Sequence, residues 1–214
     1  MGEALAAAIG IALSPFAIIP AVLLLFTVTP IKSALSFASG WFLGVGVVTV
    51  AAVLLADAMT LPDSPSREVS WLRVAVGVGL IVLGLEKFIR RGGAKKQPAW
   101  MSAMSTATPS KAFKTGVLLS LANPKVALLA IAGGFSIGAA LNGTTAEVLA
   151  SVGFAFVATI PALIPVVFYA TMKDKALAPL QSLNSWLTKN SDVAVSVVLV
   201  VIGALLLVKG ASSL

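Results

Sequence analysis

Three consecutive residues, Asn123, Pro124 and Lys125, interrupt the apolar run LSLANPKVALLAIAGG that covers residues 119–134. A lysine at the centre of a membrane helix costs about 2.5 to 3.5 kcal/mol on insertion scales, so its presence requires compensation. If its side chain snorkelled to the cytoplasmic interface, the ammonium would have to cover roughly 18 Å of helix, and a lysine stem reaches about a third of that. We therefore expect Lys125 to receive a phosphate, sulfate or carboxylate, assisted by the N-terminus of a half-helix that begins beside it.

No carboxylate is placed to neutralise Lys125 at this depth, because all 8 Asp and Glu residues lie near the ends of apolar segments. The remaining partners are backbone carbonyls, nearby polar side chains, or an anionic group on a substrate. We favour the substrate. The predicted substrate-binding residues are Lys125, Asn123, Ser14 and Ser120.

Prolines inside apolar segments predict interrupted backbone around this site. Proline has no N–H, and its ring clashes with the carbonyl four residues earlier, so that carbonyl loses its helical donor. At membrane depth such a carbonyl is tolerated when it is buried in protein or lines a wet cavity. A kink that improves packing is the alternative at each single proline. The predicted cavity-lining breaks are Pro15, Pro20, Pro124, Pro161 and Pro165, which leave the carbonyls of Ile11, Phe16, Ser120, Val157 and Pro161 without their usual donors.

Several kinds of chemistry are excluded by composition. The chain has no Cys and no His, so thiol chemistry and imidazole ligands are absent, and no metal site is expected because no carboxylates cluster at mid-membrane depth. There is no GxxxxGK[ST] phosphate loop and no evident pair of nucleophile and base. We expect neither a cofactor nor an enzymatic activity.

The elements that position these residues are membrane helices. The chain is 58% hydrophobic and 11% charged, with a mean hydropathy of +1.03, which is typical of membrane proteins. Only helices and closed barrels satisfy their backbone in lipid, and the alternating pattern of barrel strands is absent. We predict six transmembrane helices, near residues 4–26, 34–56, 71–89, 113–140, 148–172 and 193–208.

The distribution of the basic residues predicts the topology. Most of the 15 Lys and Arg residues fall in the loops after the first, third and fifth segments, and these loops share one side of the membrane. By the positive-inside rule that side is the cytoplasm, so both termini of this multi-pass plasma-membrane protein are expected outside. The net charge of +7 then reflects topology, and no nucleic-acid partner is expected.

The longest polar stretch divides the chain into two halves. We predict a first three-helix repeat over 1–90, a basic cytoplasmic loop over 91–112 and a second three-helix repeat over 113–214. Three is odd, so the halves enter the membrane with opposite orientation, as in many transporters built from inverted repeats. Ser14-Pro15 and Asn123-Pro124 occupy matching places in the two halves. Basic residues at the start of the loop could hold anionic lipid headgroups, although a plain orientation signal is the alternative: Arg90, Arg91, Lys95 and Lys96.

Two further patterns concern packing. Gly40 and Gly44 form a GxxxG motif, for which we expect internal helix contact, with a homo-oligomer as the alternative. Residues 173–190 carry leucines at three- and four-residue spacing, which predicts an amphipathic helix at the interface, with a plain linker as the alternative.

The sequence resembles a known family at several of these positions. An Asn-Pro-Lys in the fourth segment, paired with a polar-Pro break early in the first, resembles the LysE translocator superfamily of small exporters. The start LSPFAIIPAVLLLFT, the following ASGWFLG and the basic loop before LANPKVALLA look most like its GAP branch, the glycolipid-addressing proteins related to the sulfolipid-addressing protein. The resemblance implies six transmembrane helices in two inverted halves, and movement of lipids towards the cell envelope. Ser14-Pro15-Phe16 replaces the Gly-Pro-rich motif of the superfamily's amino-acid exporters.

The residues and the resemblance together predict a membrane transporter for an anionic lipid or glycolipid, with membrane lipids as partners. Export of amino acids or other small polar solutes is the first alternative. A non-transporting accessory subunit of an envelope-lipid export machine is the second.

Overall fold

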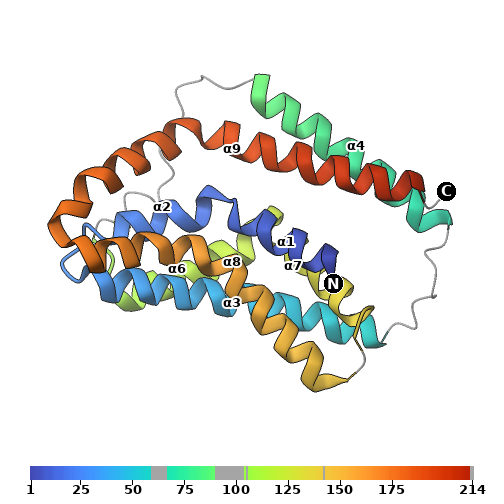
Figure 1. The fold of residues 1–214 in the computed structure, drawn as a ribbon, viewed down its shortest axis with the longest axis horizontal. Coiled ribbons are helices and arrows are strands. Elements are labelled where there is room, and N and C mark those ends of the chain that lie inside the picture. The colour runs from blue at the N-terminus through green and yellow to red at the C-terminus, as the bar shows by residue number, and fades with distance from the viewer. Residues whose placement is uncertain (59–66, 90–103, 105, 142, 213–214) are drawn as a thin grey trace. The chain divides into compact units, whose positions relative to one another are not determined.

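The computed structural model describes residues 1–58, 67–89, 104, 106–141 and 143–212, and all regular structure within them is helical (Figure 1). The chain divides into two compact units, residues 1–59 with 96–188, and residues 60–95 with 189–214. Both units combine parts of the two predicted halves. The repeat organisation itself stays a prediction.

The first unit contains both interrupted segments and the helices that pack on them. α3 lies at its centre and contacts α2, α6, α7 and α8, while α1 contacts α7 and α8. The elements of this unit are α1 (Gly2–Ala12), α2 (Pro15–Leu24), α3 (Pro30–Ala58), α6 (Pro109–Ala122), α7 (Pro124–Gly138), α8 (Thr144–Met172), the 3-10 helix η1 (Lys173–Ala176) and the beginning of α9 (Leu177–Ser212).

Two of the predicted prolines each begin a new helix. Ser14 and Asn123 precede Pro15 and Pro124, and both adopt extended backbone, with φ and ψ of −79° and 126° for Ser14 and −82° and 108° for Asn123. A residue before proline is driven out of the helical region because the proline ring clashes with it. The axis therefore bends by 44° between α1 and α2 and by 72° between α6 and α7. The expected breaks at these two positions are confirmed.

The other three prolines lie inside helices. α2 continues through Pro20, and α8 continues through Pro161 and Pro165. A long helix tolerates the loss of one bond at a proline where neighbouring helices pack against it. Pro20 and Pro165 are buried in such contacts.

Small residues bring α3 and α6 into backbone contact. A Cβ on Gly40 would collide with the carbonyl oxygen of Phe113, and a Cβ on Gly44 would collide with the hydroxyl of Ser120. On the opposite helix, Gly116 lies against the backbone of Phe37. The glycine pair thus serves internal packing, as the sequence predicts, and it fixes the register of α6 along α3.

The predicted amphipathic stretch is helical over η1 and the first turns of α9. Leu180 and Leu187 are buried, whereas Leu183 and Trp186 are exposed. Leu187 packs against Ile19 of α2. This helix therefore contributes one face to the core of the first unit.

In the second unit, α4 (Arg67–Ile89) packs against the later part of α9. Gly77 and Gly203 meet here, since a Cβ on either would lie within 2.7 Å of the carbonyl oxygen of the other. Glycines permit such close approach because they carry no side chain.

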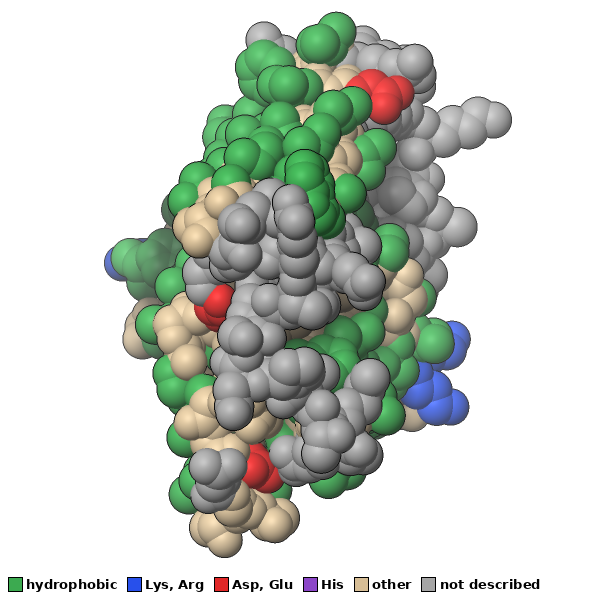
Figure 2. All heavy atoms as spheres, turned by 90° about the vertical axis from the view of Figure 1, so that its right-hand side faces the viewer, with side chains coloured by type: hydrophobic (Ala, Val, Ile, Leu, Met, Phe, Trp, Pro, Cys, Tyr) green, Lys and Arg blue, Asp and Glu red, His purple; other side chains and the backbone are tan. Residues whose placement is uncertain are grey.

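The surface of the described residues is strongly apolar. Large side chains such as Leu54, Leu149 and Val167 are each at least 60% exposed, and hydrophobic side chains cover much of the face in Figure 2. Two stretches, Pro30–Ala56 and Thr144–Leu187, are long and apolar enough to cross a membrane, and each bent pair adds one more if it forms a single span. The described residues thus contain two to four candidate spans. The six transmembrane helices stay a prediction.

Candidate functional site

Lys125 lies in the first turn of α7, directly after the break, and its side chain is half-buried. Its Nζ atom is enclosed and has no hydrogen-bond partner among the described residues. The snorkelling alternative requires the ammonium to reach the surface of the unit. The enclosed Nζ does not reach it. A buried ammonium without a partner is strongly disfavoured, so this position calls for a compensating group.

Asn123 caps the helix that carries Lys125. Its Oδ1 accepts a hydrogen bond from the backbone N–H of Lys125 at 3.1 Å, and its backbone carbonyl accepts one from Ala127 at 3.0 Å. Asn is a preferred N-cap because its side chain satisfies one of the free N–H groups of the first turn. The cap uses the acceptor of the side chain and leaves its NH₂ group as the part that could donate to a ligand.

Ser14 occupies the corresponding place before α2 without making a cap. Its side chain is fully buried, and its Oγ has no partner among the described residues. Its backbone N–H donates to the carbonyl of Ile11 at 2.9 Å. Pro15 thus leaves the Ile11 carbonyl without its usual donor, but the carbonyl is not free, because a tighter i→i+3 bond closes the end of α1.

The packing of α1 on α7 brings Ser14 and Lys125 to similar depths. The two helices run in opposite directions side by side (Figure 1), and the hydroxyl of Ser136 donates to Oε2 of Glu3 at 3.5 Å near their far ends. Starting from this contact, Ser14 lies further along the chain from Glu3, and Lys125 lies back along the chain from Ser136. Both are the same number of residues away, which is about 16 Å of helix. Two half-helix N-termini and two unpartnered polar groups therefore lie at similar depths in this unit.

Ser120 is placed differently from the other predicted ligands. Its side chain is 1% exposed, and its hydroxyl donates to the carbonyl of Val117 at 2.8 Å while lying against Gly44. The structure thus assigns Ser120 to the contact between α3 and α6. Its role in binding stays a prediction.

The four predicted lipid-headgroup residues, Arg90, Arg91, Lys95 and Lys96, lie outside the described residues.

Trp41 of α3 is a polar group that sequence reasoning missed. Its side chain is fully buried, and its Nε1 has no partner among the described residues. A buried indole N–H normally finds an acceptor. The signal in the sequence was its place next to Gly40, on the side of the helix that the glycines mark as packed.

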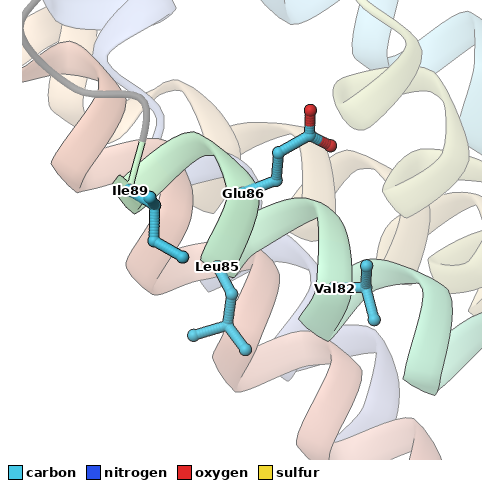
Figure 3. A pocket seen from close by; sticks show the side chains of 4 residues that line it. All are labelled: Val82, Leu85, Glu86 and Ile89. Carbon is cyan, nitrogen blue, oxygen red and sulfur yellow. The ribbon is translucent and has the colours of Figure 1, made fainter.

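Two open apolar grooves lie on helix surfaces. One, of about 530 Å³, follows a single face of α8. The other, of about 310 Å³, lies on α4 beside Val82, Leu85, Glu86 and Ile89 (Figure 3). The α8 groove is lined by Phe156, Ile160, Leu163, Ile164, Val167, Phe168 and Thr171.

Within the described residues, two long apolar helices and two bent apolar helix pairs with buried polar groups at their breaks define this chain as a helical membrane protein. It belongs to the family described as "Sap, sulfolipid-1-addressing protein", whose model matches residues 4–212. The glycolipid-addressing branch expected from the sequence is thereby confirmed, and membership of the wider superfamily stays a prediction. Comparisons with curated proteins and with solved structures give no match.

Proposed function

We propose that this protein is a multi-pass transporter that exports an anionic lipid or glycolipid across the plasma membrane, or assists its translocation. The headgroup binds at the two helix breaks of the first unit. The description of the family, which connects it with the addressing of a sulfolipid, supports a lipid cargo.

The observation that carries this proposal is the enclosed, unpartnered Nζ of Lys125 together with the unpartnered hydroxyl of Ser14, which the register of α1 on α7 puts at a similar depth. An anionic oxygen would give both groups a partner. It would also lie at the N-terminal ends of α2 and α7, where the helix dipole favours negative charge. A hydrogen bond between an ammonium and an anion is about twice as strong as one between neutral groups.

The α8 groove supports a lipid in preference to a small polar solute. A solute exporter needs an enclosed cavity with convergent polar groups. The α8 groove, which belongs to the same unit as Lys125, is open and lined mostly by aliphatic and aromatic side chains. An acyl chain on the exterior of the helices could therefore stay in apolar surroundings while its headgroup enters between them.

We further propose six crossings, both termini outside, and alternating exposure of the site to the two sides of the membrane. The bends at Ser14 and Asn123 lie where rigid half-helices meet, so rotation there would open and close the site without unfolding either half.

Transport by the purified protein in liposomes tests this function. Lys125→Met should reduce the transfer of an anionic lipid between leaflets at least about tenfold, since loss of a charge-assisted hydrogen bond costs more than one decade of affinity. Lys114→Met provides the matched control, because Lys114 is an exposed lysine on α6. It should transfer lipid at the wild-type rate.

The same assay separates the alternatives. Transfer of amino acids in place of lipid would favour the solute exporter. A correctly folded wild-type protein that moves neither class would favour the accessory subunit, and undiminished transfer by Lys125→Met would overturn the proposed site.

A further inference from the structure

We propose that Trp41 is a third hydrogen-bond donor of the Lys125 site, and that the site selects a headgroup oxyanion that only accepts hydrogen bonds. Sulfate monoesters and phosphodiesters have this chemistry. The inference deepens the proposed function and rests on it.

The first support is the state of the indole. Trp41 is fully enclosed in the first unit, and its Nε1 has no partner among the described residues. An indole N–H can only donate, so an acceptor must come from outside the described side chains and backbone. A ligand oxygen is such an acceptor.

The direction of Trp41 follows from its position on α3. At about 100° per residue, Trp41 lies between the glycine pair that faces α6 and the pair Thr49 and Ala52, which face Gly134 of α7. Its side chain is therefore directed toward the inner side of the bend between α6 and α7. Lys125 follows that bend directly.

The depth of Trp41 follows from the register of α6 on α3. Gly44 lies against Ser120, so Trp41 is one turn before this contact and Asn123 is one turn after it, about 4.5 Å in each direction. Helical side chains lean toward the N-terminus of their own helix. Lys125 therefore leans back from α7 toward the level of Ser120.

The hairpin of α2 and α3 gives the depth of Ser14 independently. These consecutive helices are in contact and are joined only by residues 25–29. Ser14 and Gly40 lie the same number of residues away from this connection, Ser14 back along α2 and Gly40 forward along α3. The two residues therefore lie at a similar depth. Ser14, Trp41 and Lys125 thus lie within about two helical turns, roughly 10 Å, of one another in depth.

The three groups differ in what they can offer a ligand, since the Ser14 hydroxyl can both donate and accept hydrogen bonds. Trp41 and Lys125 have no acceptor to offer a ligand. An ionised oxyanion would therefore give all three groups an acceptor, whereas a headgroup ammonium would be repelled by the charge of Lys125.

Tryptophan fluorescence tests this without any change at position 41. The chain has 4 tryptophans, so Trp71→Phe, Trp100→Phe and Trp186→Phe together leave Trp41 as the single emitter. The protein in nanodiscs is titrated with sulfated galactosylceramide and with its unsulfated parent. Parallel titrations with phosphatidylglycerol and phosphatidylethanolamine distinguish a phosphodiester from a sulfate and test the penalty of an ammonium donor.

We expect the emission of Trp41 to shift on addition of the sulfated lipid and of phosphatidylglycerol, and to stay unchanged with the other two. The shift should disappear with Lys125→Met. Trp41→Phe should lower affinity for the sulfated lipid about tenfold and leave binding of its unsulfated parent unchanged. Asn184→Leu is the control, because it removes a different unpartnered buried atom on α9 and should keep the preference.

Two negative outcomes have different meanings. If anionic lipid binds and Lys125→Met abolishes binding, while Trp41 does not respond and Trp41→Phe binds normally, the inference on Trp41 fails and the proposed site stands. If neither substitution alters binding of anionic lipid, the proposed site fails as well.

Discussion

At the scale of single residues, the two unpartnered groups at the helix breaks lower the stability of the fold but serve its proposed function. A buried polar group without a partner destabilises the fold, and such groups persist at sites where a ligand supplies the partner. Ser14 and Lys125 both fit this description, since each is enclosed and lacks a partner among the described residues.

Ser14→Ala should therefore weaken binding and leave the empty protein at least as stable. It removes one donor to the headgroup, for which we expect a loss of affinity of about threefold to tenfold. It also removes an unsatisfied hydroxyl, so the unfolding temperature of the lipid-free protein should stay the same or rise. Thermal unfolding and lipid titration in detergent measure the two effects.

Ser151→Ala is the control for this prediction, because Ser151 is equally buried but donates to the carbonyl of Glu147 at 2.8 Å. It should not alter lipid affinity. A marked drop in the stability of lipid-free Ser14→Ala would mean that the hydroxyl has a structural partner, and the proposal for Ser14 would be withdrawn.

At the scale of elements, the register of α6 on α3 positions the site, and it depends on Gly44 facing Ser120. Gly44→Ala should destabilise the protein by about 1 to 3 kcal/mol through overpacking, because its Cβ would overlap the hydroxyl of Ser120. Ser120→Ala in the same chain should recover part of this loss, since the nearest remaining side-chain atom would lie 3.1 Å away. Chemical denaturation of the two single variants and the double variant measures the coupling.

If the losses of the two single variants simply add, the close contact does not set the register. Gly79→Ala serves as the control, since a Cβ there meets nothing within 4 Å.

The elements also show what sequence reasoning could reach. The breaks at Ser14 and Asn123 were predictable, because the restriction before proline is local. Pro20, Pro161 and Pro165 have the same local chemistry, yet their helices continue. Burial of the proline does not separate the two groups, because Pro15 is fully buried at a break and Pro161 is only half-buried within a continuous helix. A single sequence does not distinguish them. Trp41 was missed because its placement depends on the register of α3 with α6 and α7.

At the scale of the whole molecule, the distribution of basic residues predicts that both termini lie outside the cell and the central loop inside. The chain has no cysteine, so single reporters can be introduced directly. Gly2→Cys should react with a membrane-impermeant maleimide added to intact cells. Ser110→Cys, at an exposed position on α6, should react only after the membrane is opened.

Labelling of Ser110→Cys from outside would reverse the orientation. Equal labelling of both positions from one side would contradict an odd number of crossings between them.

The most direct measurement of the central claim is the lipid that stays bound to the purified protein. Native mass spectrometry of the wild type should show one anionic lipid bound per chain. Lys125→Ala should lose it while remaining folded, and Lys125→Arg should retain part of it because it keeps the charge. The same anionic lipid bound equally to the wild type and to Lys125→Ala would contradict the account.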